Sequence, residues 1–237
     1  MAYELTKTNF IRRLLYMDQV FIVIPAYNES DSLKQVLVDL LAINYRHIVI
    51  VDDGSSCPVS EIIRDFPVHI VTHSLNLGQG AALRTGTEYA LQNGAEIVVH
   101  FDADGQHRAA EIADLVQVIA EGYDVALGSR FLHARQHVPK TKKYFILKPA
   151  IYVNWLFSGL KLSDAHNGFR ALSRHAAGKI IIEQNRMAHG TEIVAEIKKH
   201  NLKFKEVPVE IIYHEYGQNF SGGIKVVMDL IKQKFFN

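Results

Sequence analysis

Short apolar runs that are typical of buried β-strands alternate along this chain with segments of helical periodicity. The apolar runs cover residues 20–24, 47–51, 68–72, 97–100 and 124–127. Between them, apolar residues recur at helical spacing at about 30–41, 81–93 and 109–121. This alternation predicts a single α/β domain with a Rossmann-like, mainly parallel sheet flanked by helices. A chain of 237 residues is long enough for one such domain with a full core.

The ends of the chain complete the expected organisation. Residues 1–19 show no clear period and are expected to form an N-terminal extension, so that the domain spans 20–237. A helix at about 191–200, a strand at 206–213 and an amphipathic helix at about 223–235 are expected to close the domain.

The composition of the chain indicates where in the cell the protein is expected and which classes of binding partner are expected. The formal net charge is +1 with both signs mixed, so we expect no nucleic acid as a partner. The single cysteine, Cys57, excludes an intramolecular disulfide and suits a cytoplasmic protein. We expect neither a signal peptide nor a membrane-spanning run. The basic, aromatic-rich segment 140–157 suits peripheral contact with the inner face of a membrane, a cover over the site, or an ordinary core helix.

Two aspartates follow the apolar run at 97–100, where that strand is expected to end. In an open α/β sheet, ligands bind at the carboxyl ends of the strands. Asp102 and Asp104 lie one residue apart and can both offer oxygens to one hard divalent cation, and Gln106 adds a neutral oxygen. The ion, Mg²⁺ or Mn²⁺, would bridge to a diphosphate. The same sequence also suits a capped turn, because Asp104-Gly105 is common turn chemistry.

Polar residues follow other expected strands as well. Pro25–Glu29 comes after the first strand, 52–56 after the second, and Arg130 after the fifth. Residues 76–80 carry two glycines before a helix, a pattern that fits either a phosphate cradle or a tight strand-to-helix connection. Arg130 can place a fixed charge on phosphate oxygens or form a surface ion pair. We expect these loops to meet at one edge of the sheet.

Several motifs occur in a fixed order along the chain. They are Ile24–Glu29, Val51–Ser55, Asn76–Ala81, Asp102–His107, Gly128–Arg130 and Asn167–Arg170. Together they resemble the family 2 glycosyltransferases of GT-A fold, in particular the dolichyl-phosphate and polyprenyl-phosphate mannosyl- or glucosyltransferases. The resemblance covers about residues 20–235. It implies an inverting transfer of a sugar from a nucleoside diphosphate to a polyprenyl-phosphate, lipid-linked or glycan acceptor, in the synthesis of cell-envelope polysaccharides or glycoconjugates.

The resemblance also implies roles for individual residues. It places the nucleoside on residues at or just after the ends of the first two strands: Pro25, Tyr27, Glu29, Val51 and Asp53. It places the rest of the donor on Asp102, Ala103, Asp104 and Arg130, and the metal ion on Asp102, Asp104 and Gln106. An aromatic ring can pack on a base, and a carboxylate can accept hydrogen bonds from a base or a ribose. As the glycosidic bond breaks, the ion and Arg130 would stabilise the charge on the diphosphate.

The acceptor decides whether a general base is needed. A hydroxyl acceptor needs one, and Asp164 and Glu192 are the candidates, with His166 behind them. Asp164 can instead cap its loop, and Glu192 can simply occupy a first helical turn. A lipid phosphate, whose second pKa is roughly 6, needs no strong base. His214 and Phe220 stand where the lipid-phosphate branch would have basic groups, which favours the hydroxyl slightly.

Two other functional classes stay open. A sugar-phosphate nucleotidyltransferase also combines an α/β sheet, a diphosphate and a metal ion, but it usually has a glycine-rich basic loop after the first strand. A non-catalytic protein of the same fold could bind sugar nucleotides without turning them over. Besides donor and acceptor, a second copy of the chain in a homodimer is a candidate partner.

Overall fold

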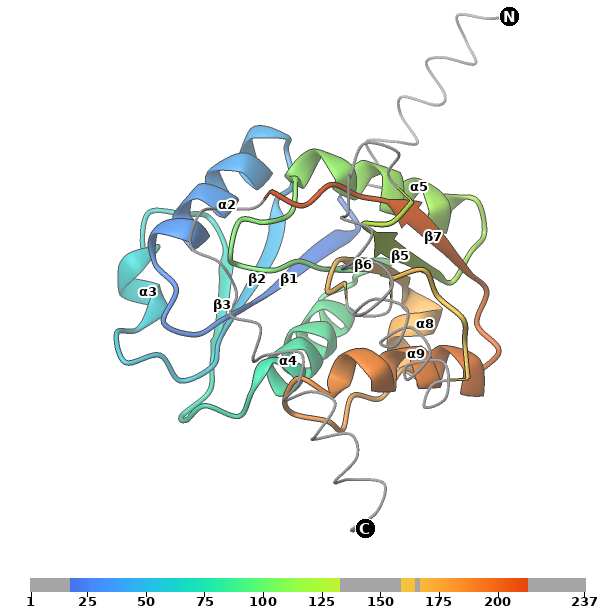
Figure 1. Cartoon of the computed structure of the whole chain (residues 1–237). Helices are drawn as coiled ribbons and strands as arrows, with labels where there is room; N and C mark the ends of the chain where they lie inside the picture. The colour runs from blue at the N-terminus through green and yellow to red at the C-terminus, as the bar shows by residue number, and fades with distance from the viewer. Residues whose placement is uncertain (1–17, 133–158, 165–166, 213–237) are drawn as a thin grey trace, which may run out of the picture.

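A seven-stranded sheet runs through the computed structural model, which describes residues 18–132, 159–164 and 167–212 (Figure 1). The strands are β1 (Val20–Ala26), β2 (His47–Asp52), β3 (His69–Thr72), β4 (Ile97–His100), β5 (Val125–Ser129), β6 (Arg170–Ser173) and β7 (Phe204–Pro208). The helices are α2 (Asp31–Ala42), α3 (Val59–Ile62), α4 (Gln79–Gln92), η1 (Ala109–Glu111), α5 (Ile112–Ala120), α8 (Arg174–Lys179) and α9 (His189–Lys199). The predicted α/β fold, a mainly parallel sheet flanked by helices, is confirmed.

Strand order places the functional edge. The order is β3-β2-β1-β4-β6-β5-β7, and β6 is antiparallel to both of its neighbours, whereas the other neighbouring pairs are parallel. The carboxyl ends of all the other strands therefore lie at one edge, and β6 begins there. The loops after β1, β2, β4, β5 and β7 meet at this edge, which is where an open α/β sheet binds its ligands.

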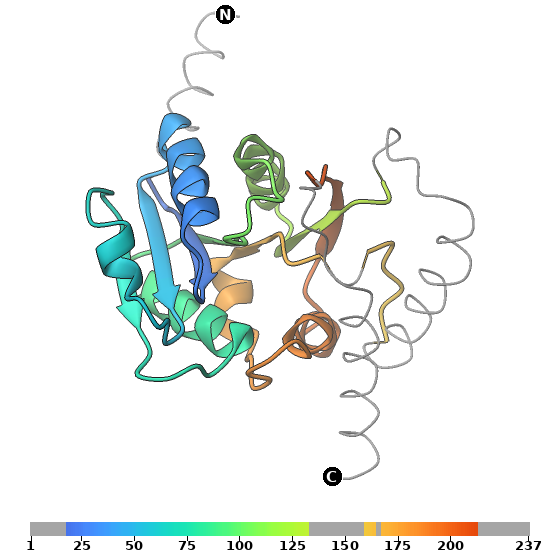
Figure 2. The same ribbon diagram turned by 60° about the vertical axis from the view of Figure 1, so that its left-hand side comes forward.

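Each face of the sheet is covered by its own helices. Val20, Ile22 and Ile24 of β1 pack with α2, α3 and α5, whereas Phe21 and Val23 pack with α4, α8 and α9. Figure 2 shows the two helical layers on opposite sides of the strands. Side chains of a strand alternate between faces, so the continuous apolar run of β1 serves both cores at once.

The later part of the domain differs from the sequence-based expectation. The expected strand at 206–213 is β7, which runs from Phe204 to Pro208. Beyond Pro208, Val209 N–H donates to the Ser129 carbonyl oxygen at the end of β5, and Ile211 then pairs with His107 in an isolated antiparallel bridge, so the chain leaves β5 earlier than expected. No strand is expected from the sequence at Arg170–Ser173, yet these residues form β6, with Arg170 buried. Ser30 precedes α2, yet its side chain makes no capping hydrogen bond. The expected segments 140–157 and 223–235, and residues 1–17, lie outside the described residues.

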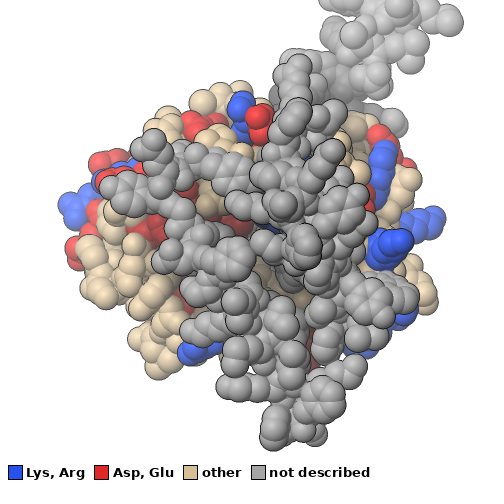
Figure 3. Space-filling view, viewed as in Figure 1, with Lys and Arg blue, Asp and Glu red and all other residues tan. Residues whose placement is uncertain are grey.

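The described surface carries mixed charge. Figure 3 shows Lys and Arg interspersed with Asp and Glu around the margin of one face. Ion pairs such as Lys205–Glu121 and Arg108–Glu210 join charges of opposite sign. In the part of the chain that the structure describes, no helix is both long and apolar enough to cross a bilayer.

Candidate functional site

The loops after β1 and β2 are joined into one surface. Asn28 N–H donates to Ser55 Oγ at 2.9 Å, and Ser56 N–H donates to Asn28 Oδ1 at 2.9 Å. Asn28 adopts a left-handed conformation with φ 54°, which asparagine tolerates better than most residues. Pro25 pairs with Val51 across β1 and β2, as the two motifs require if they share a ligand. Tyr27 is 49% exposed at this surface and is available to pack on a base.

Asp53 lies deeper than the other nucleoside candidates. Its side chain is buried and accepts hydrogen bonds from His73 Nδ1 at 2.7 Å, Leu77 N–H at 3.0 Å and Gly78 N–H at 2.7 Å. Two further N–H groups, of Gly80 and Ala81, donate to the carbonyl oxygen of Asn185. The glycine-containing segment 76–81 is therefore a tight strand-to-helix connection, in which four N–H groups bind within the protein. The predicted phosphate cradle finds no support here.

Asp102 and Asp104 follow β4 at the shared edge. Asp102 Oδ1 accepts from Gln79 Nε2 at 3.0 Å, and Oδ2 lies 3.3 Å from His107 Nε2. Asp104 Oδ1 accepts from the N–H of Gln106 at 3.0 Å. Gly105, with φ 73°, makes the turn between Asp104 and Gln106. The capped turn is therefore present, and it is compatible with the metal-site interpretation, because its hydrogen bond uses one oxygen of Asp104.

The electrostatics of the two aspartates differ. Burial raises the pKa of Asp104, and the charges of Asp102 and Glu29 raise it further, against the hydrogen bond from Gln106. For Asp102, burial would raise the pKa, but His107, Arg170 and His189 outweigh it and the pKa is lowered. A divalent cation would relieve the crowding of negative charge at Asp104.

The residues at this loop fit a hard divalent ion. Asp102, Asp104 and Gln106 carry the kinds of oxygen ligand that Mg²⁺ and Mn²⁺ prefer, and they are the residues that would hold such an ion. Among the described residues, no group of three or more His, Cys, Asp or Glu side chains encloses a metal ion. Donor phosphates, which commonly complete a Mg²⁺ coordination sphere, would have to supply the remaining ligands.

A buried polar cluster lies on the α4 and α9 side of the Asp102 loop, and sequence reasoning gave its members no role. Arg170 donates to the carbonyl oxygens of Gly168 and Asn167 at 3.0 and 3.3 Å, and burial lowers its pKa to about 10. Burial also lowers the pKa of His189 to about 4, and that of His100 well below its usual value. The arginine therefore stays charged near Asp102 while both histidines are neutral at pH 7. In the sequence, the only sign of this cluster is the motif Gly168-Phe169-Arg170.

Arg130 and Asp164 form a bidentate ion pair. Nε lies 2.6 Å from Oδ2 and Nη2 lies 2.8 Å from Oδ1. Two of the three predicted catalytic residues are thus brought together at the end of β5. Sequence spacing gave no sign of this contact, because 34 positions separate them.

Glu192, the other predicted base, lies in the first turn of α9. Its Oε2 accepts from the N–H groups of Glu183 and Gln184 at 3.1 and 2.9 Å, and burial raises its pKa. No hydrogen bond joins it to Asp102, Asp104 or Arg130 among the contacts of the described residues. His166, His214 and Phe220 lie outside the described part of the chain.

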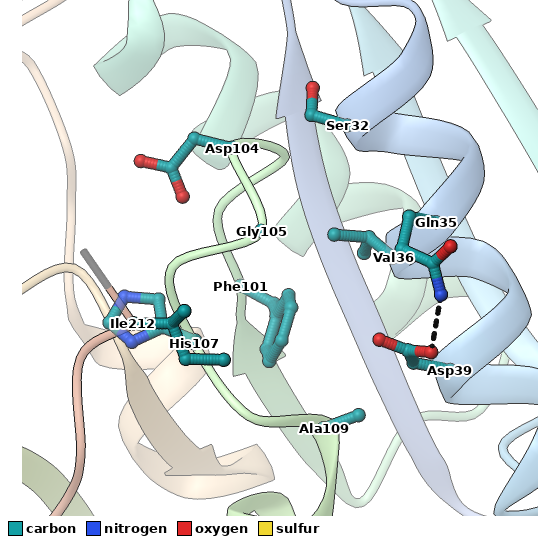
Figure 4. A pocket seen from close by; sticks show the side chains of 10 residues that line it. All are labelled: Ser32, Gln35, Val36, Asp39, Phe101, Asp104, Gly105, His107, Ala109 and Ile212. Carbon is teal, nitrogen blue, oxygen red and sulfur yellow. Dashed lines mark hydrogen bonds between the residues drawn. The ribbon is translucent and has the colours of Figure 1, made fainter. Parts of the chain in front are cut away.

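A cavity of about 390 Å³ lies between α2 and the loop that carries the aspartates (Figure 4). It is lined by Ser32, Gln35, Val36, Asp39, Phe101, Asp104, Gly105, His107, Ala109 and Ile212. In the close-up, the Asp104 carboxylate points away from α2. The carboxylate is therefore directed toward the other side of its loop.

Comparison with known proteins agrees with this architecture. The model of the family "Glycosyl transferase family 2" matches residues 21–181. An uncharacterized protein of Methanocaldococcus jannaschii is 39% identical, over 92% of this chain and 93% of its own. A UDP-N-acetylglucosamine–dolichyl-phosphate N-acetylglucosaminyltransferase of Methanococcus voltae is 33% identical, over 91% of this chain and 96% of its own.

A solved structure shows the same fold at lower identity. Glucosyl-3-phosphoglycerate synthase from Mycobacterium tuberculosis superposes with a TM-score of 0.69 at 15% identity, over 91% of this chain and 79% of its own. This likeness confirms the GT-A type of fold. With a family match over more than half of its length, the chain belongs to glycosyl transferase family 2, in the branch of the dolichyl-phosphate and polyprenol-phosphate glycosyltransferases.

Proposed function

We propose that this protein is a metal-dependent, inverting glycosyltransferase that moves a sugar from a nucleoside diphosphate to a polyprenyl phosphate. The observation that carries this proposal is the position of Asp102, Asp104 and Arg130 at one sheet edge, after strands β4 and β5. These strands flank β6, and neighbouring strands lie about 4.8 Å apart, so their ends are about 10 Å apart. One nucleoside diphosphate sugar can span that distance.

The chemistry follows from where charge develops. When the bond between the sugar and the diphosphate breaks, negative charge gathers on the leaving group and the sugar becomes oxocarbenium-like. Mg²⁺ or Mn²⁺, when bound, supplies positive charge to that leaving group. Asp102, Asp104 and Gln106 would hold the ion, and Arg130 would contact phosphate oxygens. Because both charges act on the leaving group, they stabilise the transition state more than the ground state. The acceptor attacks the opposite face and inverts the anomeric carbon.

Uridine diphosphate is the nucleotide to test first. The relative from Methanococcus voltae is named for UDP-N-acetylglucosamine, at 33% identity over nearly its whole length. In this chain the exposed ring of Tyr27, with the carboxylate of Glu29 nearby in sequence, offers a surface for a base and ribose. Ala103, which lies between the two aspartates, would be close to the donor.

A phosphate acceptor fits better than a hydroxyl. Relatives named for dolichyl phosphate, polyprenol monophosphate and undecaprenyl phosphate support it. They outweigh the slight preference for a hydroxyl drawn from His214 and Phe220. A phosphate monoester is mostly ionised near pH 7, with a second pKa of roughly 6, so no strong base is required. A lipid acceptor would bring the protein to a membrane surface, for which segment 140–157 remains the predicted contact.

Release of the nucleotide from a panel of UDP, GDP and TDP sugars, with polyprenyl phosphate as acceptor, tests the proposal. We expect release from a UDP sugar with Mn²⁺ or Mg²⁺ and loss of release with chelator. Asp104→Asn should lower the rate by on the order of 100-fold, and the exposed Asp114→Asn should not. Binding without release would instead support a sugar-nucleotide-binding protein. Formation of pyrophosphate from a nucleoside triphosphate would indicate a nucleotidyltransferase.

A further inference from the structure

We propose that Asp164 is a positioning residue that acts through Arg130, and that Glu206 fixes the segment carrying Asp164. The inference rests on the proposed contact between Arg130 and the donor diphosphate. It gives Asp164 a role other than the general base that its sequence context suggests. It also adds Glu206, to which the motifs assign no role.

The contact between Asp164 and Arg130 has the geometry of an orienting pair. Besides the bidentate contact through Nε and Nη2, Asp164 Oδ2 accepts from the backbone N–H of Arg130 at 3.1 Å. Three hydrogen bonds fix the plane of the guanidinium and the backbone that carries it. Arginine binds phosphate through a rigid planar fork, so fixing this plane fixes the direction in which it can meet an anion.

The two partners differ in their exposure to solvent. The Arg130 side chain is 29% exposed, whereas that of Asp164 is 2% exposed. A ligand that arrives from solvent therefore meets the arginine and not the carboxylate. A general base must come within hydrogen-bonding reach of the acceptor proton, and both Asp164 oxygens are instead directed at Arg130.

Glu206 of β7 holds Asp164 in turn. Its Oε1 accepts from Ser163 N–H at 2.9 Å, Ser163 Oγ at 2.7 Å and Asp164 N–H at 3.3 Å. Ser163 Oγ also lies 2.6 Å from Ser129 Oγ, at the end of β5. Since β5 and β7 are paired, the segment 163–164 is attached to two neighbouring strands. The orientation of the Arg130 side chain is therefore fixed by contacts to the sheet, and not by a loop alone.

A double-mutant cycle separates positioning from base catalysis. The measurements are UDP affinity by calorimetry with Mn²⁺, and kcat and KM for the UDP sugar. We expect Asp164→Asn to weaken UDP binding about tenfold, because the amide keeps only one acceptor oxygen. Arg130→Ala should weaken it by at least as much. In the Arg130→Ala background, Asp164→Asn should have no further effect, and the shape of the pH profile should stay unchanged.

Further variants make the result unambiguous. Arg130→Lys keeps the charge but loses the fork, so it should resemble Asp164→Asn and remains informative if Arg130→Ala does not fold. Glu206→Gln should weaken UDP binding by about two- to threefold, also only when Arg130 is present. Glu210→Gln is the control in the neighbouring segment, since Glu210 pairs with Arg108, and it should leave binding unchanged.

The contrary results are distinct. Unchanged UDP affinity in Asp164→Asn with a large fall in kcat, or effects that multiply in the double variant, would overturn the positioning role. If Arg130→Ala itself binds UDP as the wild type does, the proposed contact between Arg130 and the diphosphate is wrong, and this inference falls with it.

Discussion

Gly168 lies against the Asp102 carboxylate at the start of β6. A Cβ at this position would come 2.7 Å from Asp102 Oδ2, too close for any side chain. Asp102 is held from other directions by Gln79 and His107, so it cannot retreat without losing a hydrogen bond. Gly168 is therefore needed to leave room for Asp102, a predicted metal ligand, and not to allow an unusual backbone conformation.

Replacing this glycine should affect metal binding more than stability. We expect Gly168→Ala to displace Asp102 and to weaken Mn²⁺-dependent UDP binding by about 10- to 100-fold. Gly178→Ala is the matched control, because a Cβ there meets nothing within 4 Å. Mn²⁺ titration followed by electron paramagnetic resonance, with and without UDP, measures the effect. Equal affinities in the two alanine variants would show that Asp102 does not depend on this close approach.

The first turn of α4 also depends on a glycine that allows close packing, here between a helix and a neighbouring chain segment. Gly80 lies against the chain that leads into α9, where a Cβ would collide with the carbonyl oxygen of Gln184 and come 2.9 Å from His189 Cβ. Two N–H groups of α4 already bond to Asn185 there. The glycines of this loop allow a helix and a chain segment to touch, which explains the motif without an anion.

We expect Gly80→Ala to destabilise the fold by about 1–3 kcal/mol, the usual range for overpacking a well-packed site. Chemical denaturation at pH 7 measures this change. Gly178→Ala should leave the free energy of unfolding unchanged or raise it slightly, since alanine favours a helix. A fully stable Gly80→Ala variant that binds UDP poorly would instead restore the phosphate-cradle interpretation.

Elements with simple patterns could be predicted from sequence, and elements defined by distant contacts could not. The strands β1, β2 and β4 consist mainly of apolar residues that are buried on both faces of the sheet, so their apolar runs are clear in the sequence. In β6, by contrast, a buried arginine begins a four-residue strand. Its burial depends on Asp102 and on the carbonyl oxygens of its own loop, which no local pattern reveals. The sheet edge that carries the site could be predicted from the ends of the strands. The Arg130–Asp164 ion pair could not, because only the fold brings these two residues together.

The whole molecule carries a buried histidine pair whose neutrality makes stability depend on pH. Burial and then the charge of Arg170 lower the pKa of His189 to about 4, from 6.5 in an unfolded chain. Between pH 6.5 and 4 the unfolded chain therefore binds more protons than the folded one. Stability must fall as the pH is lowered through this window. His100, whose pKa is also lowered by burial, acts in the same direction.

The free energy of unfolding should therefore decrease between pH 7 and pH 4, with His189 contributing on the order of 3 kcal/mol. His189→Gln keeps a side chain that can donate to the Arg186 carbonyl oxygen, which His189 Nδ1 contacts at 2.7 Å. Urea unfolding at several pH values should show a smaller loss in this variant. The exposed His175→Gln should follow the wild type. Parallel curves for all three proteins would contradict the assignment.

The most direct test of the proposed function is transfer of labelled N-acetylglucosamine from UDP to lipid, measured in the organic phase. Polyprenyl phosphate and the matching polyprenol would be compared, each with Mn²⁺ and with chelator. We predict a labelled product of inverted anomeric configuration from polyprenyl phosphate, only with the metal ion, and none from polyprenol. Equal transfer in chelator, or transfer to polyprenol alone, would contradict the proposed mechanism.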